Sequence, residues 1–252
     1  MRKITAIIPT FNEEHNIIDA IKSIDFTNEI MVVDSFSTDQ TIKLATPLAT
    51  TIIKRKYKNS ASQKNWAIPQ AKHKWILLLD ADERVTPKLK EEVIKVLKSN
   101  TNYTGFWIKR QNYFMGKKVS FSGWQGDKVI RLFKRDDCRY EEKNVHAEII
   151  SKGKIGALKG KLIHNTFKSK EAYLKKLERY AKWQAKDYSG ITDKITPFHT
   201  LIKPLFRFFK HYILQFGILD GYVGFIISLY QAKAVKMRYK YLKKYRNAEG
   251  NK

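Results

Sequence analysis

The sequence predicts an α/β protein in which a mostly parallel, Rossmann-like sheet with flanking helices is followed by a helical, basic C-terminal extension. Three observations lead to this prediction. Strand-like and helix-like segments alternate through about the first hundred residues, which is the pattern of strand–helix–strand units with parallel strands. Short strand-like runs separated by glycines occupy residues 103–165. After Phe167 the chain shows helical periodicity with a face rich in Lys and Arg.

Four apolar runs in the first half have the length and the β-branched content of buried strands. They are residues 3–9, 29–34, 50–54 and 74–80. Helices are expected between and after them: Asn12 is placed to cap the first, another covers about residues 62–71, and Thr86 followed by Pro87 begins a third. Ligands of such sheets bind beyond the carboxyl ends of the strands, so the residues that follow each run are the first candidates for a site.

Composition limits the class of protein. The 252 residues are 43% hydrophobic and 13% aromatic, which is enough for a packed core and argues against disorder. Cys138 is the single cysteine, so an internal disulfide and a cysteine-based metal cluster are excluded. We find neither a secretory signal pattern nor a stretch near the roughly 20 apolar residues of a membrane span. We therefore expect a cytoplasmic protein.

The charge is strongly positive. Lys and Arg number 49 against 24 Asp and Glu, which gives a formal net charge of +25. Such an excess indicates an anionic partner or surface, and nucleic acid, anionic lipid and phosphorylated substrates all qualify. A nucleic-acid-binding protein needs a recognisable reading element or stacking platform. We find none in the sequence, so no nucleic-acid partner is expected.

A cluster of acids follows the fourth apolar run, where residues 76–85 read ILLLDADERV. Asp80 and Asp82 come just past the expected end of the strand. A carboxylate pair in that place supplies the oxygen ligands that Mg²⁺ and Mn²⁺ prefer, together with water and substrate phosphate oxygens. A metal held there neutralises a diphosphate leaving group, which would explain acids inside so basic a protein. The alternative, from these residues alone, is a solvated turn at a helix start.

Four segments of the first half, IIPTFNEEHNI, VVDSFSTDQT, QKNWAI and LLLDADE, follow one another in this order. Together they resemble the family 2 glycosyltransferases, whose fold is the nucleotide-sugar-binding α/β domain called GT-A. Residues 110–135, 145–149, 162–167 and 216–224 are similar to one branch, the lipopolysaccharide core-biosynthesis glycosyltransferases of the inner-core glucosyltransferase type. The resemblance covers nearly the whole chain. It implies an inverting, metal-dependent, hexosyltransferase-like enzyme with a UDP-sugar as the expected donor and a lipid-linked glycan as acceptor.

The resemblance assigns residues of the first half to the donor and to a Mg²⁺ or Mn²⁺ ion. It implies donor contacts for Pro9, Thr10, Glu13, Asp34, Lys64 and Asp80, and metal ligation by Asp82, with Asp80 beside the ribose or a metal-bound water. Cap and turn chemistry is the alternative for Glu13 and Asp34. The chain departs from the family at Phe36, where glycine is usual, and at residues 58–62, where a Gly-rich loop is usual. If residue 36 needs a positive φ, Phe is costly there.

Residues of the second half are expected on the acceptor side. Inverting transfer needs a group that takes the proton of the acceptor hydroxyl, and Asp127 is the candidate general base. Trp124 is expected to stack on an acceptor sugar ring, and Arg131 to contact phosphate. The alternatives are a turn aspartate beside a glycine, a packed tryptophan and an arginine on the polar face of a strand. His146 is a candidate metal ligand through a neutral ring nitrogen, with a structural histidine as the alternative.

On this interpretation residues 1–167 form the catalytic domain, with a nucleotide-binding half at 1–100 and an acceptor half at 101–167. Residues 168–252 form the helical extension, where aromatic and basic residues interleave from Phe198 onwards. Helices of that composition lie on anionic membrane surfaces, whereas the alternative is a helix packed on the domain with a solvated basic face. We expect a protein held peripherally at the inner face of the cytoplasmic membrane.

Two other functions stay open at this point. A transferase of another envelope pathway, such as exopolysaccharide or protein glycosylation, would share the same motifs. A basic nucleic-acid-binding protein is the alternative of a different class. A sugar-phosphate nucleotidyltransferase is disfavoured, because no Gly-rich phosphate loop followed by Lys or Arg appears near the first strand.

Overall fold

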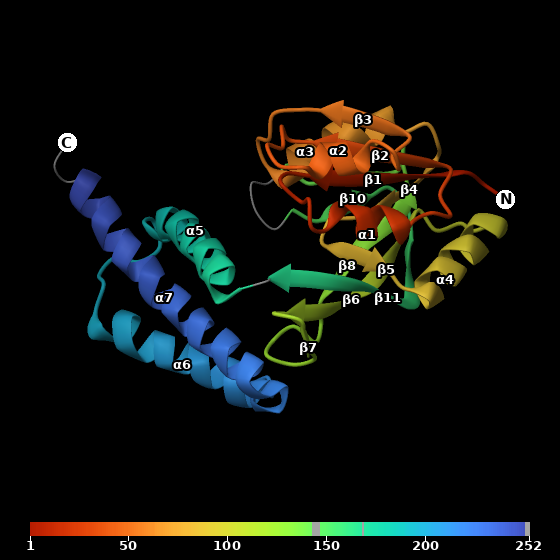
Figure 1. Cartoon of the computed structure of the whole chain (residues 1–252). Helices are drawn as coiled ribbons and strands as arrows, with labels where there is room; N and C mark the ends of the chain where they lie inside the picture. The colour runs from red at the N-terminus through yellow and green to blue at the C-terminus, as the bar shows by residue number, and fades with distance from the viewer. Residues whose placement is uncertain (143–146, 168, 250–252) are drawn as a thin grey trace. The chain divides into compact units, whose positions relative to one another are not determined.

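The chain divides into two compact units. The structure is a computed structural model that describes residues 1–142, 147–167 and 169–249. Met1–Gln111 and Asp127–His164 form one unit, which we call the α/β unit, and Asn112–Gly126 and Asn165–Lys252 form the other, the helical unit (Figure 1). The observed boundary after His164 is close to the one expected after Phe167. The assignment of residues 112–126 to the helical unit was not expected.

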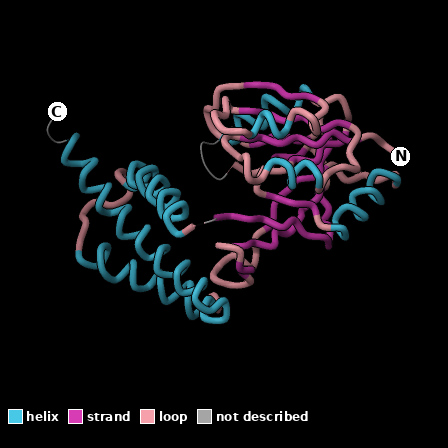
Figure 2. The backbone as a smooth tube through the Cα atoms, in the orientation of Figure 1, coloured by secondary structure: helices cyan, strands magenta, loops and turns pink. Residues whose placement is uncertain are grey.

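One large sheet contains most of the strands, drawn in magenta in Figure 2. Its strands are β1 (Ile4–Thr10), β2 (Glu29–Asp34), β3 (Thr51–Lys54), β4 (Trp75–Leu78), β5 (Glu83–Val85), β6 (Gly105–Phe114), β7 (Lys117–Val119), β8 (Lys128–Lys134) and β11 (Ile155–Phe167). Their order is β3-β2-β1-β4-β8-β6-β11-β5, with β7 paired to β6. A separate antiparallel pair is formed by β9 (Cys138–Tyr140) and β10 (Ile149–Ser151).

The four predicted strands of the first half pair in parallel, with β1 between β2 and β4. The rest of the sheet is more antiparallel than expected, since β8 runs against β4 and β6, and β5 runs against β11. Antiparallel neighbours need no crossover helix between them, so the alternation of strands and helices does not predict their pairing. The β6–β7 connection is a tight turn in which Met115 and Gly116 have φ of 52° and 73°, as two-residue hairpins require.

Helices cover both faces of the parallel part of the sheet. They are α1 (Ile17–Lys22), α2 (Thr41–Ala45), α3 (Ser60–Ala67) and α4 (Pro87–Lys98). Successive strand residues point to opposite faces, so Ile8 of β1 packs with Ile17 of α1 and Leu89 of α4, while Ile7 packs with Ala67 of α3. This two-sided burial explains why β1, β2 and β4 read as continuous apolar runs rather than as alternating ones.

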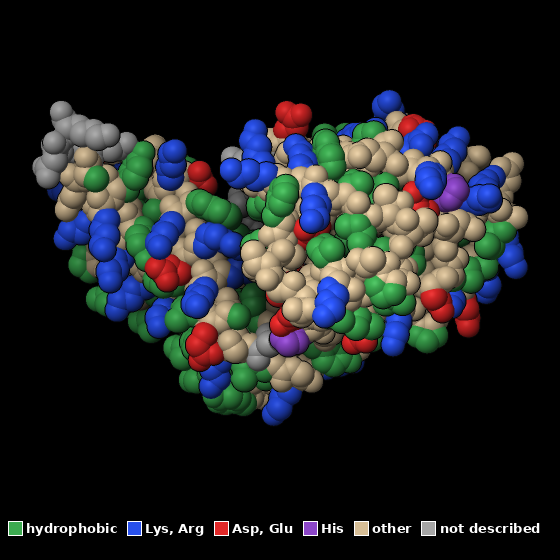
Figure 3. Space-filling model, turned by 45° about the horizontal axis from the view of Figure 1, so that its top comes forward, with side chains coloured by type: hydrophobic (Ala, Val, Ile, Leu, Met, Phe, Trp, Pro, Cys, Tyr) green, Lys and Arg blue, Asp and Glu red, His purple; other side chains and the backbone are tan. Residues whose placement is uncertain are grey.

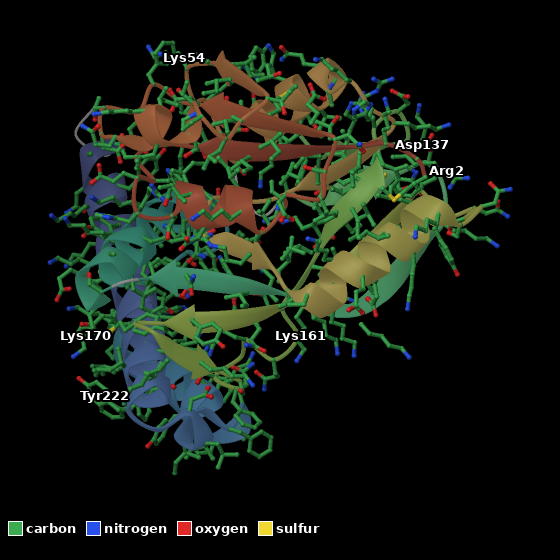
Figure 4. The ribbon with its side chains drawn as sticks, turned by 45° about the vertical axis from the view of Figure 1, so that its right-hand side comes forward. Arg2, Lys54, Asp137, Lys161, Lys170 and Tyr222 are labelled. Atoms are coloured by element: carbon green, nitrogen blue, oxygen red, sulfur yellow. The ribbon has the colours of Figure 1, made fainter. Side chains whose placement is uncertain are left out.

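The helical unit consists of α5 (Lys170–Tyr188), the π-helical turns η2 (Phe198–Ile202) and η3 (Lys210–Leu214) on either side of α6 (Lys203–Phe209), the 3₁₀ turn η4 (Gly217–Asp220) and α7 (Gly221–Glu249). Its core joins Phe114 to Tyr173 of α5 and Ile227 of α7. Figure 4 labels Lys170 and Tyr222, whose side chains hydrogen bond and so connect the starts of α5 and α7.

Asp220 explains why residues 112–126 belong to the helical unit. Its carboxylate accepts hydrogen bonds from the backbone N–H of Ser120 at 2.9 Å, from that of Phe121 at 3.0 Å and from the hydroxyl of Ser122 at 2.7 Å. A carboxylate that binds several donors holds a loop firmly. The two glycine-rich segments around residues 123 and 221 therefore bind each other.

Candidate functional site

The site lies where the order of the sheet reverses. β1 connects towards β2 on one side and is flanked by β4 on the other, so the carboxyl ends of β1 and β4 meet at the position where open α/β sheets bind ligands. Pro9 and Thr10 end β1, and the acids of the sequence ILLLDADE follow β4. The hydroxyl of Thr10 is buried and has no hydrogen-bond partner among the described residues, as expected of a group that faces a ligand site.

Asp34, at the end of β2, closes the turn that follows it. Its carboxylate accepts hydrogen bonds from the backbone N–H of Phe36 at 3.1 Å, and from the N–H and hydroxyl of Ser37 at 3.1 and 2.6 Å. The side chain is completely buried. Turn chemistry, the alternative weighed for this residue, thus accounts for its contacts, and its role at the donor stays a prediction.

Phe36 adopts the backbone conformation that usually requires glycine. Its φ is 64° and its ring is exposed. A non-glycine residue in the left-handed region costs about 1–2 kcal/mol. The departure from the family motif is therefore strained, as expected from the sequence, and it places an aromatic ring on the surface beside the carboxyl end of β2.

Asn12 does not cap α1, contrary to our expectation. Its φ is 54°, its side-chain oxygen accepts a hydrogen bond from the N–H of Thr38 at 2.8 Å, and its own N–H donates to the hydroxyl of Ser37 at 2.9 Å. Asn12 thereby joins the loops after β1 and β2. Glu13 is fixed in the same region, because its N–H donates to the hydroxyl of Thr41 at 2.7 Å and its carboxylate accepts from Asn16 at 2.6 Å.

Asp80 sits between two cations. Nζ of Lys64 lies 3.0 Å from its Oδ1, and Arg131 binds its Oδ2. Both cationic side chains are buried, with 8% and 3% exposure. Burial by itself raises the pKa of Asp80, but the positive charges of Arg131 and Lys64 outweigh it and hold that pKa well below its ordinary value. Asp80 is therefore a fixed negative charge at the end of β4.

Glu83 connects this pair to a second one. It is completely buried, and its Oε1 lies 2.8 Å from Arg131 and 3.4 Å from Arg110. Arg110 in turn donates two hydrogen bonds to the carboxylate of Asp127, at 2.7 and 3.0 Å. Burial disfavours the charge of Arg110, yet the hydrogen bond with Asp127 and the charge of Glu83 raise its pKa. We call Lys64, Asp80, Glu83, Arg110, Arg131 and Asp127 the ion network.

The contacts of Arg131 in the structure are with residues of the site itself, and its predicted contact with the acceptor phosphate stays a prediction. Its guanidinium is buried and binds Asp80, Glu83 and the hydroxyl of Tyr140, the last at 3.3 Å. Burial lowers the pKa of Arg131, but the charges of Asp80 and Glu83 raise it well above its ordinary value. Arg131 positions the acids after β4. Glu83 and Arg110 were not predicted as site residues from the sequence, although both lie in segments that resemble the family.

Asp82 lies apart from the ion network. Its Oδ2 is 3.5 Å from Nε2 of His164, and the two side chains are 28% and 14% exposed. Pairing of β5 with β11 produces this approach, because it places His164 opposite Glu83, the residue after Asp82. His164 lies in residues 162–167, one of the segments that resemble the family, but no role was predicted for it because its partner is 82 positions away in the chain.

His146 lies outside the described residues. In the described parts of the chain no group of three or more His, Cys, Asp or Glu side chains gathers in a way that holds a metal ion. Asp82 and His164 still lie side by side, and the carboxylate of Asp82 is the kind of oxygen ligand that Mg²⁺ and Mn²⁺ prefer, with water and phosphate oxygens as the other ligands.

Trp124 belongs to the core of the helical unit. Its ring meets those of Phe114 and Tyr173 edge to face, with centroid distances of 6.3 and 6.4 Å. Such contacts stabilise a packed aromatic cluster, so packing, the alternative weighed for this residue, accounts for what surrounds it. Asp127, three positions later, belongs to the α/β unit.

Comparison with known proteins agrees with this geometry. Residues 5–150 match the model of the family described as glycosyl transferase family 2. The chain belongs to this family. It is therefore a glycosyltransferase, with the α/β fold that the sequence predicted. The matched region runs from β1 to β10 and includes Asp80, Asp82 and Glu83.

Relatives of this family 2 glycosyltransferase match almost its whole length. An uncharacterized glycosyltransferase of Rickettsia typhi is 28% identical over 250 residues, covering 94% of this chain and 86% of the relative. The lipopolysaccharide core biosynthesis glycosyltransferase LpsC of Rhizobium meliloti is 27% identical over 234 residues, covering 90% and 86%. Among solved structures, glucosyl-3-phosphoglycerate synthase of Mycobacterium tuberculosis aligns with a TM-score of 0.38 and 19% identity over 44% of each chain.

Proposed function

We propose that this enzyme is an inverting, metal-dependent glycosyltransferase of lipopolysaccharide core biosynthesis, which moves a sugar from a UDP-sugar to a lipid-linked glycan. The observation that carries the proposal is the pair of acidic groups with different surroundings at the switch point of the sheet. Asp82 is partly exposed beside His164, whereas Asp127 is held by Arg110 at the other end of the ion network. The similarity to LpsC supports the acceptor class.

The residues after β1 and β4 are suited to the donor. The buried hydroxyl of Thr10 and the chain from Pro9 to Glu13 line the carboxyl end of β1, where a nucleotide would bind. Asp82 and His164 would hold a Mg²⁺ or Mn²⁺ ion, which neutralises the charge of the leaving diphosphate when it is bound. The negative charge of Asp80 is balanced by the positive charges of Lys64 and Arg131, so this carboxylate needs no further counter-ion.

Asp127 is suited to the acceptor side. In inverting transfer, the acceptor oxygen forms a bond to the anomeric carbon while the bond from that carbon to the diphosphate oxygen breaks. The hydroxyl proton passes to a carboxylate. The two hydrogen bonds from Arg110 fix the orientation of the Asp127 carboxylate, which is what a base that must meet an incoming hydroxyl needs.

Replacing Asp127 by Asn tests this role. Asp127→Asn keeps the shape of the side chain and removes the base, so kcat should fall by roughly 10²-fold or more, while the dissociation constant of the donor stays close to that of the wild type. Steady-state kinetics and donor titration measure the two quantities. Asp136→Asn is the matched control, because Asp136 pairs with Arg135 on the surface. A variant with normal kcat, or one that has lost donor binding, places the base elsewhere.

Thermal shift with a panel of nucleotide sugars, with and without Mn²⁺, tests the proposed function. A ligand that binds the folded state at 100 times its Kd stabilises it by about 2.7 kcal/mol, so one donor should raise Tm clearly, and only with the metal. If nucleotide sugars leave Tm unchanged in both conditions, the proposal is wrong. If a donor binds but a lipopolysaccharide core acceptor receives no sugar, the enzyme belongs to another envelope pathway.

A lipid-linked acceptor also implies a position at a membrane. We propose that the enzyme is cytoplasmic and works peripherally at the inner face of the cytoplasmic membrane. The basic, aromatic composition of the C-terminal half supports this proposal, since each base near an anionic surface contributes roughly 1 kcal/mol to attachment.

A further inference from the structure

The helical unit carries an unusual number of exposed apolar side chains. Fourteen large apolar residues between positions 198 and 229 are each at least 40% exposed, whereas nine others reach that exposure in the rest of the described chain. They lie on η2, α6, η3, η4 and the start of α7. We call them the apolar ridge. Leu205 and Leu219 are 66% and 65% exposed, and Figure 3 shows apolar side chains gathered on this unit with Lys and Arg among them.

The helix that carries the ridge has its apolar face turned outwards. Phe198, Ile202, Leu205 and Phe209 follow one another at spacings of three or four residues and so share one face, and all four are exposed. The opposite face, with Pro204 and His211, is the buried one. A helix on a water-facing surface shows the reverse pattern. Contiguous apolar surface of this kind marks a place where a protein meets a partner or a membrane.

The charge of this segment indicates which partner covers the apolar ridge. Residues 198–246 contain ten Lys and Arg and a single acid, Asp220, and that acid is bound by residues 120–122. A second copy of the chain on the ridge would bring like charges together, which opposes association. An anionic lipid bilayer satisfies both features, because its acyl chains cover the apolar side chains and its headgroups attract the bases.

The shape of this segment favours insertion over spanning. Among the described residues no single helix is long and apolar enough to cross a membrane. The segments 198–214 and 217–248, bent by 71° at their junction, reach the necessary length and composition only when they are taken together. Much of the second segment is already used inside the unit, because Ile227, Val235 and Leu242 are buried. The exposed apolar residues are therefore concentrated around the bend near Phe216, whose φ is 55°.

We propose that the apolar ridge inserts into the headgroup and upper acyl region of an anionic bilayer, with the bend around residues 214–219 entering it. This interaction surface deepens the proposed function, since it names the partner at which a lipid-linked acceptor is met. Vesicle binding is measured without donor or acceptor, however, so it succeeds or fails independently of sugar transfer, which the donor panel tests separately.

Environment-sensitive labels test the insertion directly. Cys138 is buried, so Leu205→Cys and Leu219→Cys each introduce one accessible thiol for a fluorescent dye in the full-length chain. Ile191→Cys is the matched control, because Ile191 is 75% exposed in the same unit but outside the ridge. Vesicles that contain phosphatidylglycerol should shift the emission of both ridge labels to the blue. They should leave the Ile191→Cys label unchanged, and vesicles of phosphatidylcholine alone should shift the ridge labels less.

A second pair of variants measures affinity. Leu205→Ser with Phe206→Ser should weaken binding to phosphatidylglycerol vesicles at least tenfold in flotation assays, whereas Ile191→Ser should not change it. The substituted residues are exposed, and circular dichroism checks the fold. Equal binding to neutral and anionic vesicles, or wild-type binding by the double variant, overturns the proposal. So does a dimer that the double variant converts to monomer while vesicle binding stays the same, because the ridge is then a protein interface.

Discussion

Asp82→Asn should abolish metal-dependent sugar transfer, with kcat/KM at least about 10³-fold lower than in the wild type. Loss of a metal that stabilises a diphosphate leaving group removes several kcal/mol of transition-state stabilisation, and each 1.36 kcal/mol is about tenfold in rate. Asp82 is the acid after β4 that stands outside the ion network and keeps an exposed edge beside His164. The amide retains the shape of the side chain but is a much weaker ligand for a hard cation.

Metal titration separates this role from a structural one. The Asp82→Asn variant should need far more Mn²⁺ for half-maximal donor binding, and His164→Gln should raise that concentration at least about tenfold, while both variants unfold at the wild-type urea concentration. Asp25→Asn is a suitable control, since Asp25 is exposed and pairs with Lys90 on the surface. A wild-type enzyme that keeps its activity in a chelator, together with an active Asp82→Asn variant, would show that no metal acts here.

The first half of the fold was predictable because β1, β2 and β4 are buried on both faces. Continuous apolar runs such as residues 76–79, each followed by polar residues, are visible in a sequence without any knowledge of pairing. The positions of Pro9, Thr10 and Asp80 at the carboxyl edge follow directly from parallel strand order. The strain at Phe36 was also predictable, because it depends on the local backbone conformation and on the absence of glycine.

The partners within the site were not predictable, because they depend on strand register. Arg131 meets Glu83 across 48 positions of the chain, and Asn65 binds the backbone of Tyr140 across 75. The first contact arises from the antiparallel arrangement of β8 beside β4 and the second from the packing of α3 against β9, neither of which the sequence shows. His164 reaches Asp82 through the pairing of β11 with β5. Patterns of composition identify which segments are buried, but not which residues of distant segments stand opposite each other.

In the helical unit the sequence predicted a helix but not which face of each helix is buried. Helical periodicity after Phe167 predicted a helix with a basic face, and the structure contains α5 there, with Tyr173 and Leu177 buried. The same reasoning cannot tell which face of the segment after residue 198 turns inwards, because both of its faces carry apolar side chains. Pro204 and His211 lie on the inward face, and Nδ1 of His211 hydrogen bonds with the carbonyl oxygen of Ser122 at 2.9 Å.

Glu83→Gln should reduce the free energy of unfolding by about 3–5 kcal/mol. Breaking a buried ion pair by removing one partner has this cost, because it leaves an uncompensated charge in a poorly solvated place. Glu83 is completely buried and faces the buried guanidinium group of Arg131 at 2.8 Å and the half-buried one of Arg110 at 3.4 Å. Its other oxygen accepts the N–H of Asp80 at 3.1 Å. In this variant Arg131 still pairs with Asp80 and Arg110 still pairs with Asp127. The loss of stability should therefore lie near the lower end of this range.

Urea unfolding measures this change, and Glu91→Gln is its control. Glu91 is exposed on α4, so its substitution should alter stability by no more than about 0.5 kcal/mol. Hydrogen exchange shows where the fold is destabilised, because the amides of β4 and β8 should lose protection in Glu83→Gln before those of α5 do. Arg131 and Arg110, which bind Asp80 and Asp127, both contact Glu83. If these two carboxylates act as proposed, the variant should also have a lower kcat in the absence of urea, where it is fully folded. A loss of stability below about 1 kcal/mol with normal kcat would mean that Asp80 and Asp127 are held in place without the charge of Glu83.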